Sequence, residues 1–295
     1  MPEGLIIKGV GGLYQIESKE GIFNCKIRGI FRKKGITPLP GDFVEFTIIN
    51  EKLGEGWIEE IKERKNFFIR PPVANVNMMA IVISVKNPAP DFLLADKLII
   101  SAQRNDIEPV IIINKIDLSD KESLSTIEEV YRGTGFTVIP MSKVTMEGYE
   151  ELYREITNKR TVFAGQSGVG KSTILNNVIN SYVMETGDVS SKIQRGRHTT
   201  RHVQLLPLKC GGYVADTPGF SLYSLDGIEH DELKWMYPEF DNLNGQCRFN
   251  GCNHITEPGC CVKDAVSKVE ISKIRYNCYN KLYEELKEQY DKRYK

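Results

Sequence analysis

The sequence predicts a multidomain α/β protein with three parts in a row. These are an N-terminal β-barrel of the OB-fold type, a central doubly wound and mostly parallel sheet, and a C-terminal, mainly helical, zinc-binding domain. Three observations predict this arrangement: short β-rich runs broken by glycine and proline, then apolar strands alternating with helical segments, and last a polar region with a Cys/His cluster. We place the domain boundaries at 1–67, 68–225 and 226–295.

The first part contains the runs LIIKGV, LYQIE, IFNCKIRGIF, DFVEFTII and WIEEI, whose spacing predicts a small barrel of about five strands. The segment from Lys26 to Lys34 holds five basic residues with Phe31 among them and no acidic residue. Two interpretations stay open for it: a basic, aromatic edge that contacts RNA, or a solvated hairpin.

The pattern changes after RKNFFIRPP, whose adjacent prolines suit a linker. MMAIVIS and PVIIINK are continuous apolar runs, typical of parallel strands buried on both faces, and DFLLADKLIISAQRN between them predicts a crossover helix. The alternation continues through FTVIP, a helix near 149–157, TVFAG, a helix from Lys171 and YVADT. This is the pattern of a doubly wound α/β domain.

Length, charge and hydropathy set outer limits. The chain has 295 residues and zero formal net charge, from 39 basic and 39 acidic residues, so contact with nucleic acid must use local patches. It has no apolar stretch near the roughly 20 residues needed to span a bilayer, and its N-terminus lacks the layout of a secretory signal. We expect a cytoplasmic protein without a membrane partner.

A phosphate-binding loop is predicted at 165–172, where the sequence reads G-x-x-x-x-G-K-S between an apolar strand and a helix. Glycines let backbone N–H groups surround phosphates, Lys171 reaches the β- and γ-phosphates, and the Ser172 hydroxyl binds Mg²⁺. The residues expected to hold the nucleotide are Gly165, Gln166, Ser167, Gly168, Val169, Gly170, Lys171, Ser172 and Thr173. The alternative is a glycine-rich turn that binds nothing.

A base-reading motif, NKID, ends the strand at 110–113. The Asp117 carboxylate can accept two hydrogen bonds from the N1–H and exocyclic amine of guanine, a pair that adenine does not offer. Lys115 can lie over the base, and Asn114 can brace the loop. NKID alone could be a polar strand end, but with the phosphate loop it indicates GTP.

A third motif, DTPG, follows the strand at 213–215. Asp216 can face the Mg²⁺ shell, and the Gly219 N–H can sense the γ-phosphate; a structural turn is the alternative. The next residue, Phe220, cannot orient water as the glutamine of Ras-like enzymes does, so hydrolysis needs another group or a partner.

The polar, basic stretch at 195–202 lies between the phosphate loop and DTPG. Thr199 or Thr200 can complete the Mg²⁺ shell, and His198 can orient or deprotonate the attacking water. His198 and Lys171 are therefore the candidate catalytic residues, although His198 could equally be an ordinary surface histidine.

The C-terminal part contains C-x4-C-x-H-x5-C, formed by Cys247, Cys252, His254 and Cys260. Three thiolates and one imidazole are the ligands of a closed tetrahedral zinc site, which has no open position for a substrate and therefore stabilises the fold. Clustered free thiols are the alternative. Cys261, next to Cys260, is expected to point elsewhere.

Two other classes of protein are compatible with parts of the pattern. One is a nucleic-acid-binding module in which GTP acts as a non-hydrolysed timer, which Phe220, the barrel and the cysteine cluster favour. The other is a metabolic P-loop kinase, which NKID disfavours. Single-turnover release of phosphate separates the first from a GTPase, and nucleotide preference separates the second.

Taken together, NKID at 114, GQSGVGKST at 165, GRHTT at 196, DTPG at 216 and the C-x4-C-x-H-x5-C cluster resemble the ribosome small subunit-dependent GTPase A family. PGD at 40, the RPP segment and NHITEPGC are also similar, so the resemblance covers nearly the whole chain. It is specific because the base-reading motif precedes the phosphate loop, which is a circular permutation of the usual GTPase order.

The resemblance implies an OB-fold, a permuted GTPase domain and a zinc domain, acting in late maturation of the small ribosomal subunit. It implies hydrolysis of GTP to GDP that the subunit stimulates, rRNA and ribosomal proteins as contacts, a monomer, and a role for His198. Two positions depart from the pattern: Met141-Ser142-Lys143-Val144 replaces the usual SAK, where Ser142 is the expected base contact, and Cys261 stands where relatives often have alanine.

Overall fold

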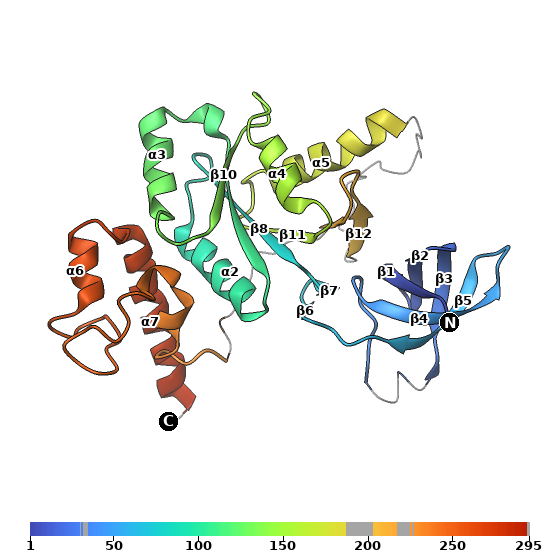
Figure 1. The fold of residues 1–295 in the computed structure, drawn as a ribbon, viewed down its shortest axis with the longest axis horizontal. Helices are drawn as coiled ribbons and strands as arrows, with labels where there is room; N and C mark the ends of the chain where they lie inside the picture. Colours follow the sequence, from blue (N-terminus) through green and yellow to red (C-terminus); the bar gives the residue numbers. More distant parts are fainter. Residues whose placement is uncertain (30, 32–34, 187–202, 217–224, 226, 294–295) are drawn as a thin grey trace.

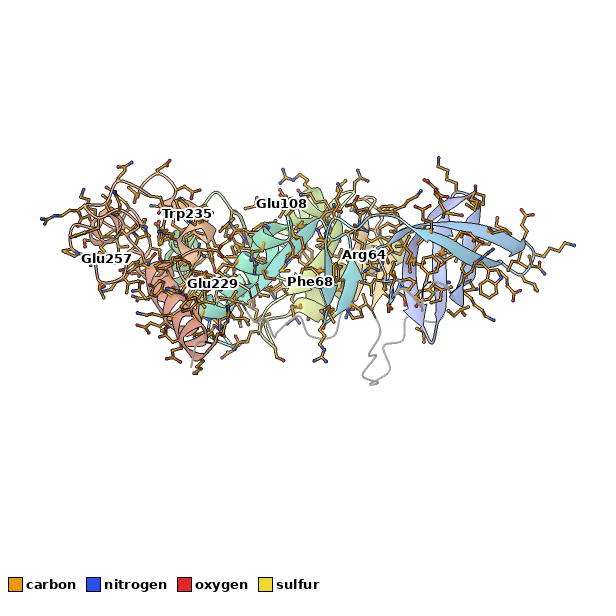
Figure 2. The ribbon with its side chains drawn as sticks, turned by 90° about the horizontal axis from the view of Figure 1, so that it is seen from below. Arg64, Phe68, Glu108, Glu229, Trp235 and Glu257 are labelled. Atoms are coloured by element: carbon orange, nitrogen blue, oxygen red, sulfur yellow. The ribbon has the colours of Figure 1, made fainter. Side chains whose placement is uncertain are left out.

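The three predicted parts lie in a row in the computed structural model, which describes residues 1–29, 31, 35–186, 203–216, 225 and 227–293. Figure 1 shows the barrel at one end, the α/β domain in the centre and the C-terminal domain at the other end. Figure 2 shows the same order from below, with Arg64 and Phe68 near the barrel junction and Trp235 and Glu257 in the C-terminal domain.

The N-terminal part is a closed five-stranded barrel of the predicted type. Its strands are β1 (Glu3–Val10), β2 (Leu13–Ser18), β3 (Gly21–Ile27), β4 (Phe43–Asn50) and β5 (Glu55–Ile61). They pair in the order β1-β2-β3-β5-β4, and β4 returns to β1 to close the barrel. The predicted third run extended to Phe31, but β3 ends at Ile27, and Phe31 lies beyond it with its ring in the barrel core.

The segment predicted as a linker forms a short antiparallel hairpin, β6 (Phe67–Ile69) and β7 (Pro72–Ala74). It packs closely against the PGD segment. A Cβ on Gly41, which has φ +97°, would lie 2.0 Å from the Ala74 carbonyl oxygen, so only glycine fits there. The Asn75 side-chain amide also donates to the Gly41 carbonyl oxygen at 2.8 Å, and together these contacts hold the barrel against the central domain.

The central sheet has the strand order β10-β9-β8-β11-β13-β12, parallel except at β12. Its strands are β8 (Met78–Ser84), β9 (Glu108–Asn114), β10 (Thr137–Met141), β11 (Arg160–Ala164), β12 (Gln204–Pro207) and β13 (Tyr213–Asp216). The antiparallel β12 was not predicted. It pairs with β13 and, through Lys8 and Gln204, with β1 of the barrel.

Helices cover both faces of this sheet, as the uninterrupted apolar strands predicted. They are α2 (Phe92–Arg104), η1 (Ile116–Leu118), α3 (Lys121–Val130), α4 (Tyr149–Ile156) and α5 (Lys171–Thr186). Met79, Ile81 and Ile83 of β8 point to the α2–α3 face, and their neighbours in β8 point to the α4–α5 face. This is the doubly wound domain predicted from the sequence.

The C-terminal domain consists of η2 (Leu233–Met236), η3 (Pro238–Phe240), α6 (Cys261–Ser267) and α7 (Lys273–Arg293). Its core joins the buried residues Tyr237, Phe240, Tyr279 and Leu282 with Ile100 of α2. The domain is therefore mainly helical, as predicted, and it shares α2 with the central domain.

Candidate functional site

The predicted phosphate loop joins β11 to α5 at the carboxyl edge of the sheet, where ligands bind in such folds. Gly165 (φ +130°) and Gly170 (φ +101°) have backbone conformations that favour glycine. A Cβ on Gly165 would lie 2.2 Å from the Val82 carbonyl oxygen, and one on Gly170 would lie 2.3 Å from the Asn114 side-chain nitrogen. Both glycines are therefore required by close packing of the loop.

The Lys171 ammonium folds back over the loop. Its Nζ donates to the carbonyl oxygens of Gly165 and Gln166, both at 2.7 Å. Burial lowers the pKa of Lys171, and a phosphate anion nearby would offset that effect. Because α5 begins at Lys171, the first backbone N–H groups of the helix and this ammonium act on the same place.

The base-reading motif reaches across the end of β8 to the phosphate loop. The Asn114 side-chain amide donates to the Val169 carbonyl oxygen at 2.7 Å, and this contact is buried. Lys115 Nζ donates to the Gly168 carbonyl oxygen at 2.8 Å. Lys115 itself has φ +65°, which turns the chain so that Asp117 follows on an exposed turn. The two motifs thus form one continuous site.

Ser142 lies beside Asp117, although the loops that carry them are 25 positions apart. The fully buried Ser142 hydroxyl donates to an Asp117 carboxylate oxygen at 2.5 Å and accepts from the Val144 N–H at 3.0 Å. This contact fixes the direction of the Asp117 carboxylate. The loss of the usual alanine leaves this contact intact, because the Val144 atom that contacts Ser142 is the backbone nitrogen.

Sequence reasoning missed the loop from β8 to α2, which forms a third wall of the site. The Asn87 carbonyl oxygen accepts from Lys115 Nζ, and the Ser84 hydroxyl donates to the Pro88 carbonyl oxygen at 2.8 Å. Asn87 has φ +52°, a conformation in which asparagine is enriched. The signal available was an Asn-Pro turn at the carboxyl end of a buried strand.

The residues predicted to complete the magnesium shell are only partly within the described structure. Asp216 ends β13, in register with Gln204 of β12, and Ser172 is exposed in the first turn of α5. His198, Thr199, Thr200, Gly219 and Phe220 lie outside the described residues. Their roles stay predictions.

The four predicted metal ligands converge in the C-terminal domain. The ligand atoms of Cys247, Cys252, His254 and Cys260 all lie within 4.8 Å of one another. Cys247 Sγ is 3.6 Å from His254 Nδ1 and 4.0 Å from Cys260 Sγ, and His254 Nδ1 is 3.3 Å from Cys260 Sγ. Tetrahedral zinc, with bonds of about 2.3 Å to sulfur and 2.0–2.1 Å to nitrogen, implies ligand separations of roughly 3.5–3.8 Å.

The surroundings of the cluster also suit zinc. Burial lowers the pKa of His254 to about 4, which leaves the ring neutral and able to bind a metal through Nδ1. The other ring nitrogen, Nε2, lies 3.0 Å from the Asn244 side-chain oxygen, a contact that fixes the ring orientation. Cys261 is not one of the four mutually close ligand atoms: its Sγ lies beside the Cys247 thiol and donates to the Gln246 carbonyl oxygen at 3.0 Å.

Comparison with protein families identifies the chain. The model of the RsgA GTPase matches residues 61–226, and that of the RsgA N-terminal domain matches residues 3–58. A relative from Ruminiclostridium cellulolyticum, named small ribosomal subunit biogenesis GTPase RsgA, is 51% identical over 290 residues, which is 98% of this chain and 95% of that protein. The chain belongs to the RsgA GTPase family.

Other members of the RsgA GTPase family agree along the full length. A protein of the same name from Caldanaerobacter subterraneus is 45% identical over 99% of this chain and 98% of its own. The crystal structure of YjeQ from Thermotoga maritima superposes with a TM-score of 0.82 at 37% identity, covering 97% of this chain and 98% of that one.

The crystal structure of YloQ, described as a circularly permuted GTPase, superposes with a TM-score of 0.81 at 39% identity, covering 98% of this chain and 96% of that one. The predicted permutation and fold class are confirmed. Membership of a GTPase family establishes GTP hydrolysis and excludes both the metabolic kinase and the non-hydrolysing module considered above. Among the described residues, no helix is long and apolar enough to cross a membrane.

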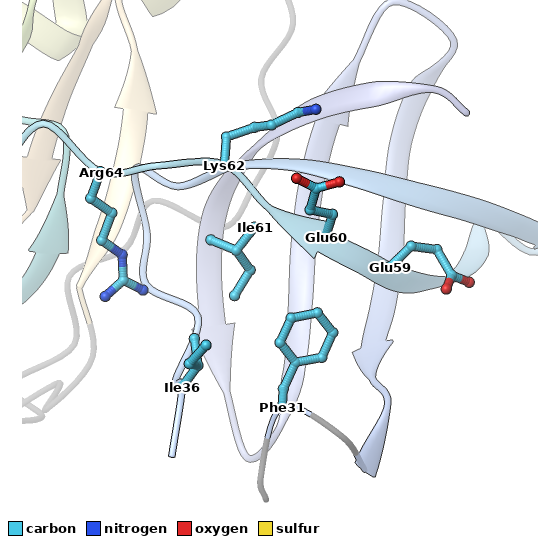
Figure 3. Close-up of a pocket in the computed structure, with 7 residues that line it drawn as sticks. All are labelled: Phe31, Ile36, Glu59, Glu60, Ile61, Lys62 and Arg64. Atoms are coloured by element: carbon cyan, nitrogen blue, oxygen red, sulfur yellow. The ribbon is translucent and has the colours of Figure 1, made fainter. Parts of the chain in front are cut away.

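One of the two interpretations of the 26–34 segment was a basic edge with an exposed aromatic ring. The position of Phe31 does not agree with that interpretation. Phe31 is 8% exposed and belongs to the barrel core. The ring lines a hollow of about 450 Å³. Figure 3 shows Ile36, Ile61 and Arg64, which line the same hollow. Arg28 pairs with Glu59 at 2.6 Å. The ring of Phe31 is therefore not available on the surface for base stacking.

Proposed function

We propose that this chain is a GTP hydrolase that binds the small ribosomal subunit and acts late in its maturation, with turnover stimulated by the subunit. The family supports GTP hydrolysis in ribosome biogenesis. One structural observation carries the nucleotide site: Asn114 and Lys115 of the base-reading motif bond directly to carbonyl oxygens of the phosphate loop. A single GTP molecule can therefore occupy both motifs.

The residues have distinct roles in this proposal. Backbone N–H groups of 165–173 surround the phosphates, and the Lys171 ammonium moves from its loop carbonyls towards the β- and γ-phosphates. Asp117, oriented by Ser142, accepts from the guanine edge. Magnesium neutralises charge on the phosphates, with Ser172, Asp216 and either Thr199 or Thr200 as its protein ligands.

The water-activating group of the proposal is His198. The residue after DTPG is Phe220, whose ring has no hydrogen-bonding atom, so the usual glutamine is replaced by a group from elsewhere. Gly219 senses the γ-phosphate, and the 195–202 segment changes its arrangement when GTP becomes GDP. In this proposal the ribosomal subunit stimulates hydrolysis by placing His198 next to the attacking water.

The flanking domains supply the ribosomal contacts. We place the boundaries at 1–67, 68–225 and 226–295, with rRNA and ribosomal proteins as partners of the outer two domains. Cys247, Cys252, His254 and Cys260 hold a structural zinc ion, and the ligand separations support this assignment. We propose that the protein acts as a monomer in the cytoplasm, where its GTP and ribosomal substrates are found.

Asp117→Asn is expected to change which base the protein prefers. The asparagine amide would place a donor opposite the exocyclic amine of guanine, but it pairs with the 2-oxo group of xanthine. A well-placed pair of hydrogen bonds to a base is worth about 1–3 kcal/mol, so we expect GTP affinity to fall roughly 10- to 100-fold while XTP affinity rises. Equilibrium binding of fluorescent GDP and XDP measures this change.

Asp106→Asn is the matched control. Asp106 is exposed in the same domain, at a φ of +52° that asparagine tolerates, and it lies between α2 and β9 at the opposite edge of the sheet. This variant should keep the base preference of the parent protein. Unchanged GTP preference in Asp117→Asn would refute the base-reading role.

A further inference from the structure

Helix α2 connects the phosphate loop to the C-terminal domain. Its two sides belong to different cores: Ala95, Leu98, Ile99 and Ala102 face the sheet, whereas Ile100 and Leu93 pack into the C-terminal core. Figure 1 shows α2 between the sheet and α7. A movement of the C-terminal domain would therefore move α2, whose other side is part of the core of the central domain.

The first turn of α2 packs directly on the phosphate loop. Asp91, Leu94 and Ala95 line a narrow crevice with Gly165, Gln166 and Val169, which leaves no room for a water molecule. The Asp91 carboxylate accepts from the Leu94 N–H at 3.0 Å and begins the helix. The Gln166 side-chain oxygen is buried here without a hydrogen-bond partner among the described residues.

The next residues of α2 hold the C-terminal domain through buried charges. Asp96 is fully buried, and its carboxylate accepts from the Arg275 guanidinium at 2.5 Å and from the Tyr237 hydroxyl at 2.9 Å. Arg275 is 1% exposed and also donates to both carboxylate oxygens of Glu239, at 2.8 and 3.1 Å. The guanidinium stacks on the Tyr237 ring, 4.6 Å from its centroid.

Separating the charged residues of this cluster would cost free energy. Burial raises the pKa of Asp96 to about 6, and the two donors favour the ionised form, which the carboxylate keeps at neutral pH. Separating the domains would remove both donors, Arg275 and Tyr237, from the Asp96 carboxylate and would leave Arg275 with Glu239 alone, and breaking a buried ion pair is costly. Two contacts nearer the surface reinforce the connection: Lys97 pairs with Glu285 at 2.7 Å, and Arg104 donates to the Gly227 carbonyl oxygen at 3.1 Å.

We propose that the C-terminal domain holds the nucleotide pocket in its binding conformation through α2, with Asp96 and Arg275 as positioning residues. Docking of the C-terminal domain and occupation of the phosphate loop are then thermodynamically linked, and each stabilises the other. This inference rests on the nucleotide site of the proposed function. It assigns the zinc-containing domain a second role, in retention of the guanine nucleotide.

The test uses the full-length, zinc-loaded chain and two substitutions of different severity. Asp96→Asn removes the charge that Arg275 pairs with, and Tyr237→Phe removes only one hydroxyl bond to Asp96 while the ring stays on Arg275. Stopped-flow release of fluorescent GDP is the measurement. Couplings between sites typically amount to 5–150-fold, and we expect GDP to leave about tenfold faster from Asp96→Asn and about threefold faster from Tyr237→Phe.

Tyr279→Phe is the matched control, because it also deletes one buried tyrosine hydroxyl bond in the C-terminal domain. That hydroxyl donates to the Asn253 carbonyl oxygen at 2.6 Å, within the C-terminal domain and not to α2. The control should release GDP within about twofold of the parent rate, even with a comparable loss of thermal stability. If it accelerates release as much as Tyr237→Phe does, general destabilisation explains the effect and the inference is overturned.

Hydrogen exchange provides the reciprocal readout. Saturating GDP should slow exchange of the α7 amides around Arg275 in the parent protein, and this protection should weaken in Asp96→Asn. Parental GDP release from both Asp96→Asn and Tyr237→Phe would overturn the inference while leaving the proposed function intact. Failure of the parent protein itself to bind guanine nucleotide would instead refute the proposed function.

Discussion

Lys171→Ala is expected to lower GTP turnover by roughly 10²- to 10³-fold, the size of effect seen when one preorganised donor to developing charge is removed. The Lys171 ammonium is held over the phosphate loop by the carbonyl oxygens of Gly165 and Gln166, at 2.7 Å each. Lys115 also donates to the loop, at Gly168, but it belongs to the base-reading motif. Single-turnover hydrolysis at saturating GTP measures the chemical step directly.

Lys159→Ala is the control for that loss. Lys159 belongs to the same domain, precedes β11 rather than following it, and pairs with Glu108 at 2.5 Å at the opposite edge of the sheet. Its removal should leave turnover near the parent value. Parental turnover in Lys171→Ala would mean that the phosphates do not bind at this loop.

Cys260→Ala is expected to abolish zinc binding and unfold the C-terminal domain. Among the described residues, one Cys/His cluster could hold a metal ion, and structural zinc contributes roughly 10–16 kcal/mol of apparent binding energy at pH 7 in small domains. A domain whose described core is small cannot replace a contribution of that size. Metal content by mass spectrometry and thermal unfolding followed by circular dichroism measure the two effects.

Cys261→Ala supplies the comparison at the next position in the chain. Its thiol donates to the Gln246 carbonyl oxygen and is not one of the four mutually close ligand atoms, so this variant should retain zinc. The opposite pattern, with zinc kept in Cys260→Ala and lost in Cys261→Ala, would show that the adjacent cysteine is the ligand. That result would contradict the geometry of the cluster.

Local sequence patterns predicted the elements that are buried by their neighbours, because burial requires apolar residues at fixed positions. Ile111, Ile112 and Ile113 are apolar in succession because both faces of β9 are covered, and such a run is typical of a central parallel strand. The phosphate loop and the cysteine cluster were predictable for a similar reason. Their residues lie close in sequence, so their spacing already fixes the geometry.

Contacts between distant segments could not be predicted in this way. Asp96 and Arg275 are 179 positions apart, and each taken alone resembles an ordinary surface charge on a helix. Phe31 lies among basic residues, yet its ring is buried in the barrel core. The strand β12 is short and pairs with both β13 and β1, so its existence depends on the placement of two domains.

The most direct test of the central claim is single-turnover release of phosphate from GTP, measured with and without purified small ribosomal subunits. The sequence places Phe220 where a water-orienting glutamine would stand, so the chain alone should hydrolyse GTP slowly. Addition of the subunit should accelerate hydrolysis by a large factor in the parent protein and by much less in His198→Ala. A rate that small subunits leave unchanged would contradict the assignment of this chain as a GTPase that acts on the small ribosomal subunit.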